Sequence, residues 1–162
     1  MKISLNWLRD YIDVNLTAQE IDEKLTMSGL EVESIEEIGK DIRDFLIAEV
    51  LEVSKHPNAD KLTVCQVNDG TKNHQIICGA PNVAGGQKVV LGLAGMMVPR
   101  NAHAPDGAPF KLTKAKIRGV ESNGMICSEF ELGISDNHDG IMVLPNDAPV
   151  GKKLLDYLNI SD

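Results

Sequence analysis

The sequence predicts a mainly β protein built on a small closed barrel, with short helices near both ends of the chain. Five or six short apolar runs follow one another between about residues 44 and 128. Clusters of glycine and proline separate these runs, and helical periodicity is confined to the first 39 and the last dozen residues. This many short strands in roughly 100 residues fit a barrel or a sandwich, and a five-stranded Greek-key OB barrel matches the size better.

The first 39 residues are predicted to form two helices and one extended segment. Ser4 is placed to cap a helix that runs to about Tyr11, because apolar residues recur there at helical spacing. Thr17 and Glu20 have the spacing of a capping box at the start of a second helix. Residues 30–38 predict a strand with one slip in its alternation. A segment this small rarely buries enough surface to fold alone.

The remaining elements are mostly strands. Their predicted ranges are 45–53, 62–67, 74–78, 87–93, 110–120 and 124–128, and a short helix over 151–158 follows them.

Charge is distributed unevenly along the chain. The formal net charge is −8, which argues against a generic nucleic-acid binder. Residues 1–39 carry three basic and nine acidic side chains, whereas residues 40–150 carry eleven and thirteen. The acidity is therefore concentrated in the first segment, and the middle segment retains enough cations to present a basic face.

Three cysteines, four dispersed histidines and the absence of a CxxC pair give no zinc-ligand spacing. We expect the cysteines to be buried free thiols in a reducing compartment, and the protein to be cytoplasmic. No apolar run approaches the ~20 residues of a membrane span, and the charges that follow residue 8 interrupt any signal peptide.

The predicted strand over residues 110–120 holds the clearest candidate binding surface. Side chains alternate between the faces of a strand, so Lys114, Lys116 and Arg118 are predicted to point outward together. Three cations at about 7 Å intervals suit a phosphate backbone. The alternative is an ordinary solvated strand whose lysines protect a sheet edge.

Two further segments carry polar candidates. Ser122 and Asn123 lie at a predicted Asn-Gly turn, where they bond either RNA or their own backbone. His56 lies in the loop between the first two strands, which flanks the ligand groove in OB folds. No serine or cysteine has a histidine at informative spacing, so no catalytic residue is predicted. Aromatic residues are scarce, which favours recognition of structured RNA by shape and backbone.

Four motifs in this order resemble the tRNA-binding domain of the endothelial-monocyte-activating-polypeptide type. They are HPNADKL at 56–62, CGAPNV at 78–83, KIRGVESNGMICS at 116–128 and ELG at 131–133. The resemblance covers about residues 40–150. It implies an OB fold and a tRNA-binding surface on Lys114, Lys116, Arg118, Ser122, Asn123, Lys61 and Asn82.

The flanks resemble bacterial phenylalanyl-tRNA synthetase β subunits. MKISLNWL at 1–8, GLEVE at 29–33 and GIMVLP at 140–145 carry this resemblance. It implies that residues 1–39 and 151–162 belong to the two halves of a small, truncated α/β domain. The OB barrel, residues 40–150, is then inserted between these halves.

The resemblance implies an auxiliary tRNA-binding module of an ATP-dependent, AMP-forming phenylalanine–tRNA ligase of two α and two β subunits. ATP and magnesium belong to the full enzyme, and no catalytic, cofactor or metal residue is expected in this chain. The partners are then tRNA, the α subunit and a second β subunit, and not a membrane. The acidic first segment and the near-neutral barrel leave open a structural or protein-interaction scaffold with little RNA contact. A free-standing tRNA chaperone is a further alternative.

Overall fold

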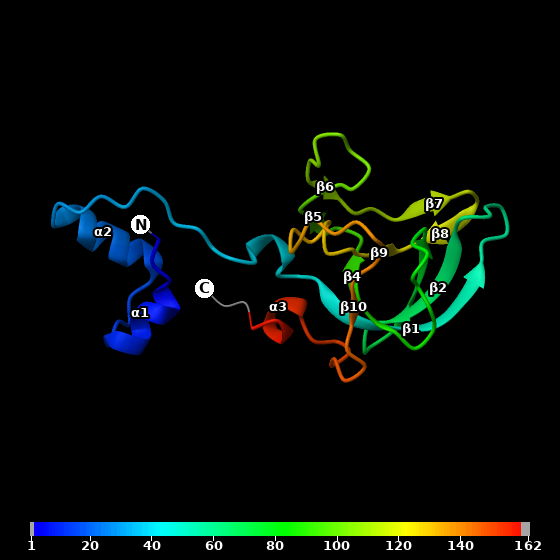
Figure 1. Cartoon of the computed structure of the whole chain (residues 1–162), viewed down its shortest axis with the longest axis horizontal. Helices are drawn as coiled ribbons and strands as arrows, with labels where there is room; N and C mark the ends of the chain where they lie inside the picture. The colour runs from blue at the N-terminus through cyan, green and yellow to red at the C-terminus, as the bar shows by residue number, and fades with distance from the viewer. Residues whose placement is uncertain (1, 160–162) are drawn as a thin grey trace. The chain divides into compact units, whose positions relative to one another are not determined.

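The structure of the protein, a computed structural model, describes residues 2–159. Within these residues the chain divides into two compact units, 2–40 and 41–159. The first unit contains helices α1 and α2, and the second contains every strand (Figure 1). The prediction of a mainly β protein with few helices is confirmed.

The first unit begins with two capped helices. Helix α1 spans Leu5–Tyr11, and its first turn is capped by Ser4, whose Oγ accepts a hydrogen bond of 3.0 Å from the Trp7 amide. Helix α2 spans Ala18–Met27 and follows a complete capping box. The Glu20 amide donates to Thr17 Oγ1 at 3.2 Å, and the Thr17 amide donates to Glu20 Oε2 at 2.8 Å. Both predicted helices are confirmed, because side-chain caps replace the partners that the first amides of a helix lack.

The predicted strand over residues 30–38 is wrong, because the structure forms no regular element there. An extended segment becomes a strand only when a neighbour accepts and donates its backbone hydrogen bonds. No strand of the first unit offers that pairing within the described residues. Neither α1 nor α2 contains a buried residue.

Six antiparallel strands of the second unit form one sheet that curls into a nearly closed barrel (Figure 1). The sheet order is β10-β4-β1-β2-β3, and β9 also pairs with β4. The strands are β1 (Leu46–Lys55), β2 (Thr63–Asn68), β3 (Asn73–Cys78), β4 (Lys88–Leu93), β9 (Gly124–Ile126) and β10 (Val143–Leu144). Strands β1, β2, β3, β4 and β9 confirm predicted strands, whereas β10 was not predicted and the strand expected over residues 110–120 does not form as one element.

Strand β1 is long enough to belong to both sides of the barrel. Its first part pairs with β4 and its remainder pairs with β2. The register with β2 shifts between Val50 and Glu52, which marks an irregularity at Leu51. An extra residue in one strand bends it and increases its twist. This bend lets a single strand curve around the barrel.

Hydrogen bonds complete the closure beside β3. The Ile77 amide donates to Ser122 Oγ at 3.0 Å, and the Asn123 amide donates to the Gln75 carbonyl oxygen at 2.9 Å. Residues 122–123 therefore supply partners where β3 has no neighbouring strand in the sheet order. Closing a sheet on itself protects edges that otherwise pair with other chains.

Two apolar clusters cover opposite faces of the central strands. One cluster fills the barrel and comprises Ala48, Val50, Cys65, Val67, Ile76, Cys78, Val89, Leu91, Ile126 and Ile141. The other centres on Phe45, Ile47 and Val90 and extends to Leu154. Alternate residues of β1 and β4 belong to alternate clusters, as the two-residue period of a strand requires. All three cysteines are buried free thiols, as predicted.

The segment between β4 and β9 forms four short strands in two pairs. Strands β5 (Met97–Val98) and β6 (Phe110–Lys111) pair with each other, and β7 (Ala115–Ile117) pairs with β8 (Val120–Ser122). The prediction of one continuous strand over residues 110–120 is therefore wrong. The chain leaves strand geometry after Lys111 and reverses direction at residues 118–119.

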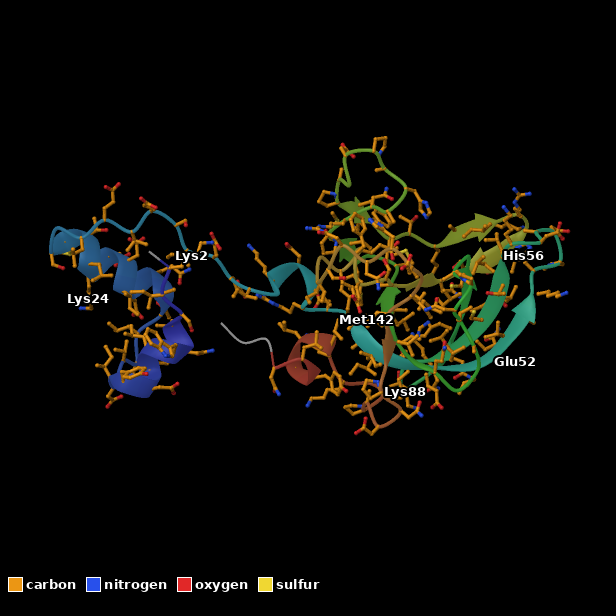
Figure 2. The ribbon with its side chains drawn as sticks, viewed as in Figure 1. Lys2, Lys24, Glu52, His56, Lys88 and Met142 are labelled. Carbon is orange, nitrogen blue, oxygen red and sulfur yellow. The ribbon has the colours of Figure 1, made fainter. Side chains whose placement is uncertain are left out.

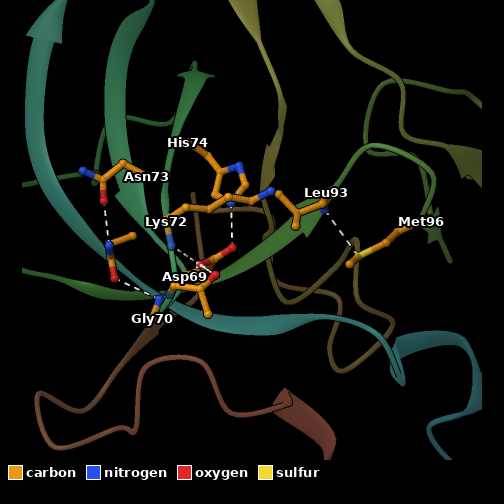
Figure 3. Close-up of polar contacts among 9 residues, drawn as sticks. Asp69, Gly70, Lys72, Asn73, His74, Leu93 and Met96 are labelled. Carbon is orange, nitrogen blue, oxygen red and sulfur yellow. Dashed lines mark hydrogen bonds and ion pairs between the residues drawn. The ribbon is translucent and has the colours of Figure 1, made fainter.

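The β2–β3 hairpin turns around a buried carboxylate (Figure 3). Asp69 Oδ1 accepts hydrogen bonds from the Thr71 and Lys72 amides at 2.8 and 2.9 Å. Asp69 Oδ2 lies 2.6 Å from Nε2 of the buried His74. Burial by itself raises the pKa of Asp69, but the hydrogen bonds from His74, Lys72 and Thr71 outweigh it and hold the pKa below its usual value. The carboxylate is therefore ionised at neutral pH.

Short helical turns flank the barrel in sequence. The 3-10 helix η1 spans Lys40–Ile42, and α3 spans Leu154–Tyr157, which is shorter than the predicted helix over 151–158. Leu154 is fully buried in the apolar cluster that centres on Phe45, Ile47 and Val90. Its amide donates to the Phe45 carbonyl oxygen at 3.0 Å. None of the helices formed by residues 2–159 has the length and apolarity of a membrane span.

Candidate nucleic-acid interface

The β7–β8 hairpin reverses through a two-residue turn, Arg118–Gly119. Ile117 and Val120 pair across it, and φ is 47° at Arg118 and 91° at Gly119. A two-residue hairpin turn of type I′ requires positive φ at both central residues. Glycine adopts this conformation freely, whereas a side chain in the left-handed region costs about 1–2 kcal/mol. The fold therefore holds Arg118 at the tip of the hairpin in a conformation that arginine disfavours.

The loop between β1 and β2 holds this turn through His56, which is labelled in Figure 2, and through Asn58. The Asn58 amide donates to His56 Nδ1 at 3.0 Å, so Nδ1 is an acceptor and the ring proton lies on Nε2. Nε2 then donates to the Ile117 carbonyl oxygen at 3.0 Å. The Asn58 side-chain amide donates to the Arg118 carbonyl oxygen, also at 3.0 Å. His56 is buried and positions the turn, a role that the sequence did not indicate.

The other strand of the hairpin is fixed to β3 by side-chain hydrogen bonds. Gln75 Nε2 donates to the Glu121 carbonyl oxygen at 2.8 Å. Ser122 Oγ accepts from the Ile77 amide and donates to the Gly124 carbonyl oxygen, both at 3.0 Å. Ser122 is buried, so the structure uses its hydroxyl to close the barrel. The hairpin is thus held from both sides.

All four predicted cationic site residues are exposed to solvent. They are Lys61, Lys114, Lys116 and Arg118. Among residues 2–159, none of these four side chains forms an ion pair with a carboxylate. Their charges therefore remain available to a ligand at low ionic strength.

The predicted alternation holds for only one of the three cations on the expected strand. Lys116 lies in β7 opposite Glu121, on the face away from the Ala115–Ser122 and Ile117–Val120 pairs. Lys114 precedes the strand and Arg118 lies in the turn. The cations are therefore presented by a hairpin and its approach, and not by a straight row. Glu121 beside Lys116 lowers the positive potential of this face.

Two predicted polar residues have structural hydrogen bonds. Asn82 Nδ2 donates to the Ile141 carbonyl oxygen at 3.0 Å, and its Oδ1 accepts from the Ile141 amide at 2.9 Å. Asn123 is half-buried and pairs through its backbone with Gln75 and Ala94. The predicted Asn123–Gly124 turn is wrong, because Gly124 lies in β9. A Cβ at Gly124 would overlap the Gly92 carbonyl oxygen, so the glycine permits close approach of two strands.

A groove of about 620 Å³ runs beside the hairpin. Hairpin residues Ala115 and Ile117 line it together with Leu62 of the β1–β2 loop, Ile77 of β3 and Met125 of β9. Lys111, which the sequence analysis did not select, also lines this groove. The loops after the first strand and before the last strand flank the ligand groove of OB folds, and they do so here. We call this hollow the central groove.

The sequence model of one family, described as "Putative tRNA binding domain", matches residues 45–153. The chain belongs to this family of tRNA-binding domains. The match covers the whole barrel, the hairpin and the β1–β2 loop that holds it.

Several curated relatives of the chain have the same name. The chain is 47% identical over 163 residues to "Phenylalanine--tRNA ligase beta subunit" of Burkholderia pseudomallei (strain 1710b), covering 100% of this chain and 20% of that protein. It is 49% identical over 162 residues to the protein of the same name from Oleidesulfovibrio alaskensis, covering 100% and 19%. The chain therefore spans about a fifth of the length of these relatives. The resemblance inferred from the sequence is confirmed.

A solved structure titled "Crystal structure of MetRS related protein from Pyrococcus horikoshii" aligns with 68% of this chain and 87% of that chain. The sequence identity is 20% and the TM-score is 0.48.

Two of the three thiols of the tRNA-binding domain have raised pKa values. A hydrogen bond with Cys78 lowers the pKa of the third, Cys65, to about 7, but this side chain is fully buried and out of reach of a substrate. Burial and the nearby Glu131 carboxylate raise the pKa of the Cys127 thiol. A hydrogen bond with Cys65 and burial raise the pKa of Cys78. A thiol with a raised pKa is a poor nucleophile at neutral pH. In the described part of the chain, no three His, Cys, Asp or Glu side chains are arranged to hold a metal ion.

Proposed function

We propose that residues 40–150 are an auxiliary tRNA-binding module of a phenylalanine–tRNA ligase β subunit. One observation carries the proposal beyond family membership. His56 and Asn58 hold the Arg118–Gly119 turn so that Lys116 and Arg118 are exposed beside the central groove. A strained turn bearing a free cation, fixed from another loop, suits a surface that contacts a phosphate backbone.

The full ligase supplies the chemistry in this proposal. It attaches phenylalanine to tRNA with ATP and magnesium, forms AMP, and acts in the cytoplasm as two α and two β subunits. The described residues offer no cluster of metal ligands, so we assign ATP and magnesium to other parts of that enzyme. The module itself contributes binding and orientation of tRNA and no catalytic group.

Within the site, we divide the candidate residues according to their exposure and hydrogen bonds. Lys61, Lys114, Lys116 and Arg118 are assigned to RNA phosphates because they are exposed and unpaired with carboxylates among residues 2–159. Asn123 remains a candidate for a polar contact. Ser122 and Asn82 are assigned to the scaffold, because bonds within the barrel occupy their side chains.

The segments on either side of the barrel are proposed to belong to one domain. Residues 1–39 and 151–162 belong, in this proposal, to the two halves of one small α/β domain. The absence of any buried residue in α1 or α2 supports it, and so do the exposed Trp7, Tyr11 and Leu30. Hydrogen exchange tests it. The α1 and α2 amides should be protected in a form extended past residue 162, and equal protection in both forms would contradict the pairing.

Filter binding of tRNA over a range of salt concentrations tests the module. We expect weak binding with a slope of log K against log salt of about −2 to −4, since three or four cations contact phosphate. The double charge reversal K116E/R118E should abolish measurable binding. K152E, a reversal at an exposed lysine outside the groove, is the matched control and should bind like the unchanged chain.

The same experiment tests the scaffold alternative. The acidic residues 1–39 and the position of Glu121 opposite Lys116 in the β7–β8 register favour a barrel that contacts other protein domains and little RNA. A complete lack of tRNA affinity at low salt would favour this reading. Binding that K116E/R118E leaves unchanged would instead move the RNA to another face.

A further inference from the structure

A second hollow, of about 500 Å³, adjoins the central groove. Ala102 and His138 line both hollows. Its walls come from the β5–β6 loop and from the loop between β9 and β10. We call it the loop cleft; Arg100, Asp106, Phe130, Asp136 and His138 line it. Its volume lies within the range of about 300–1,000 Å³ that suits a small ligand.

Three side chains in the loop cleft form a cation–aromatic stack. The ring centroids of Phe130 and His138 are 4.0 Å apart with 37° between their planes. The Arg100 guanidinium carbon lies 5.3 Å from the Phe130 centroid. His138 is exposed, so its ring continues an aromatic surface into solvent. Planar rings and guanidinium groups of this kind stack on nucleobases.

Hydrogen bonds fix both loops that carry the stack. Ser128 and Glu131 bond each other reciprocally at the start of the β9–β10 loop, with distances of 2.8–3.2 Å. The Arg100 amide donates to the Glu131 carbonyl oxygen at 3.2 Å, which ties the β5–β6 loop to this structure. Ser135 Oγ donates to Glu129 Oε2 at 2.6 Å. A surface ordered before binding loses less entropy when a ligand arrives.

The charges of the loop cleft decide which part of a nucleic acid it suits. Arg100 is the cation that lines it, and Asp136 pairs with this guanidinium at 2.9 Å. Asp106 adds a second carboxylate to the lining. The carboxylates outnumber the arginine, which disfavours a phosphate. They suit a neutral ring whose edge carries N–H donors, since carboxylates accept such hydrogen bonds.

We propose that the loop cleft binds one unpaired base of the RNA whose backbone contacts the β7–β8 hairpin. The base stacks on His138, with Phe130 and Arg100 beneath it, and its amino edge faces Asp106 and Asp136. This inference rests on the proposed tRNA-binding function. It adds an aromatic contact where His138 lines both the loop cleft and the central groove.

A short RNA hairpin with a single-stranded tail containing 2-aminopurine tests this proposal with the full 162-residue chain. Stacking of the tail on His138 should quench the 2-aminopurine fluorescence. H138A should remove the quenching and weaken binding about five- to tenfold, the cost of one stacked base. H138F keeps a planar ring and should restore both signals. Circular dichroism verifies that each variant is folded.

K116E/R118E separates this inference from the proposed function. If the RNA binds, K116E/R118E weakens it and H138A changes neither fluorescence nor affinity, the stacking site is refuted while the tRNA-binding function stands. If the RNA does not bind the unchanged chain at low salt, the proposed function fails as well. Equal quenching of free 2-aminopurine riboside would assign the loop cleft to free nucleosides and refute its role in RNA binding.

Discussion

The β2–β3 and β7–β8 hairpins stabilise their turns in different ways. The β2–β3 turn is held from within, because Asp69 accepts the amides of its own turn and bonds His74 five residues later. The β7–β8 turn is held from outside by His56 and Asn58, about 60 residues earlier in the chain. One turn is a local structure and the other exists only in the folded barrel.

The difference assigns the β2–β3 turn to the stability of the barrel and the β7–β8 turn to the proposed RNA-binding surface. The local turn has a buried hydrogen bond between Asp69 and His74 and is part of the scaffold, since both side chains are almost inaccessible to solvent. The β7–β8 turn exposes Arg118 in a left-handed conformation next to the central groove. A surface that binds RNA must expose charge, so its stabilising contacts come from the backbone side of the turn.

Loss of the Asp69 carboxylate is expected to have the largest effect on folding. D69A removes the acceptor of four hydrogen bonds, from the Thr71 amide and hydroxyl, the Lys72 amide and the ring of His74, and leaves His74 buried without its acceptor. We expect a loss of about 2–4 kcal/mol in the free energy of unfolding, measured with urea. E52Q changes an exposed carboxylate on β1 and should stay within about 0.5 kcal/mol. A loss below 1 kcal/mol in D69A would show that the turn does not depend on its carboxylate.

Acid should weaken the barrel through the same group. The folded-state pKa of Asp69 is lowered, so its stabilisation is present above the unfolded-state pKa of about 3.9 and is lost as the pH falls below that value. Between about pH 4 and pH 2 the free energy of unfolding should fall more steeply in the unchanged chain than in D69N. Parallel curves for the two proteins would rule out this contribution.

The local turn and most of the barrel were predictable from the sequence for the same reason. Asp69-Gly70 is a turn signal between two β-rich runs, and alternation along β1 to β4 reports burial inside a barrel. Capping residues before α1 and α2 likewise act within three residues of their partners. Local chemistry of this kind is visible in a single sequence.

The β7–β8 hairpin was not predictable, because the residues that hold its turn are remote from it in sequence. Alternation over residues 110–120 looked like one strand, and nothing in that run reveals that His56 reaches the Ile117 carbonyl. Asn123-Gly124 carried a stronger turn signal than Arg118-Gly119, yet the close approach of β9 to β4 takes Gly124 into the sheet. The cationic residues were found from their composition, and their arrangement came only from the structure.

Removing the hydrogen bond from Asn58 to the β7–β8 turn should reduce RNA binding more than it reduces the stability of the fold. N58A removes one exposed hydrogen bond to the turn and should cost about 0.5–1 kcal/mol in unfolding free energy. The β7–β8 amides should exchange faster with solvent, and tRNA affinity should fall about two- to fivefold as the cations become less well ordered. N146A, at an exposed asparagine before α3, is the matched control and should change neither measurement.

Substitution of Arg118 has the smallest expected effect on stability. It is the most informative for the site, because it separates the backbone strain of the turn from the charge of the side chain. R118G relieves the left-handed strain of arginine, although glycine gains freedom in the unfolded chain. The unfolding free energy should therefore rise by about 0.5 kcal/mol or remain unchanged. Loss of one phosphate contact should weaken tRNA binding and reduce the salt slope by about 1. R118K keeps both the charge and the strain and should retain the slope. A variant R118G that binds tRNA with an unchanged slope would show that the strained turn serves the barrel and not the RNA.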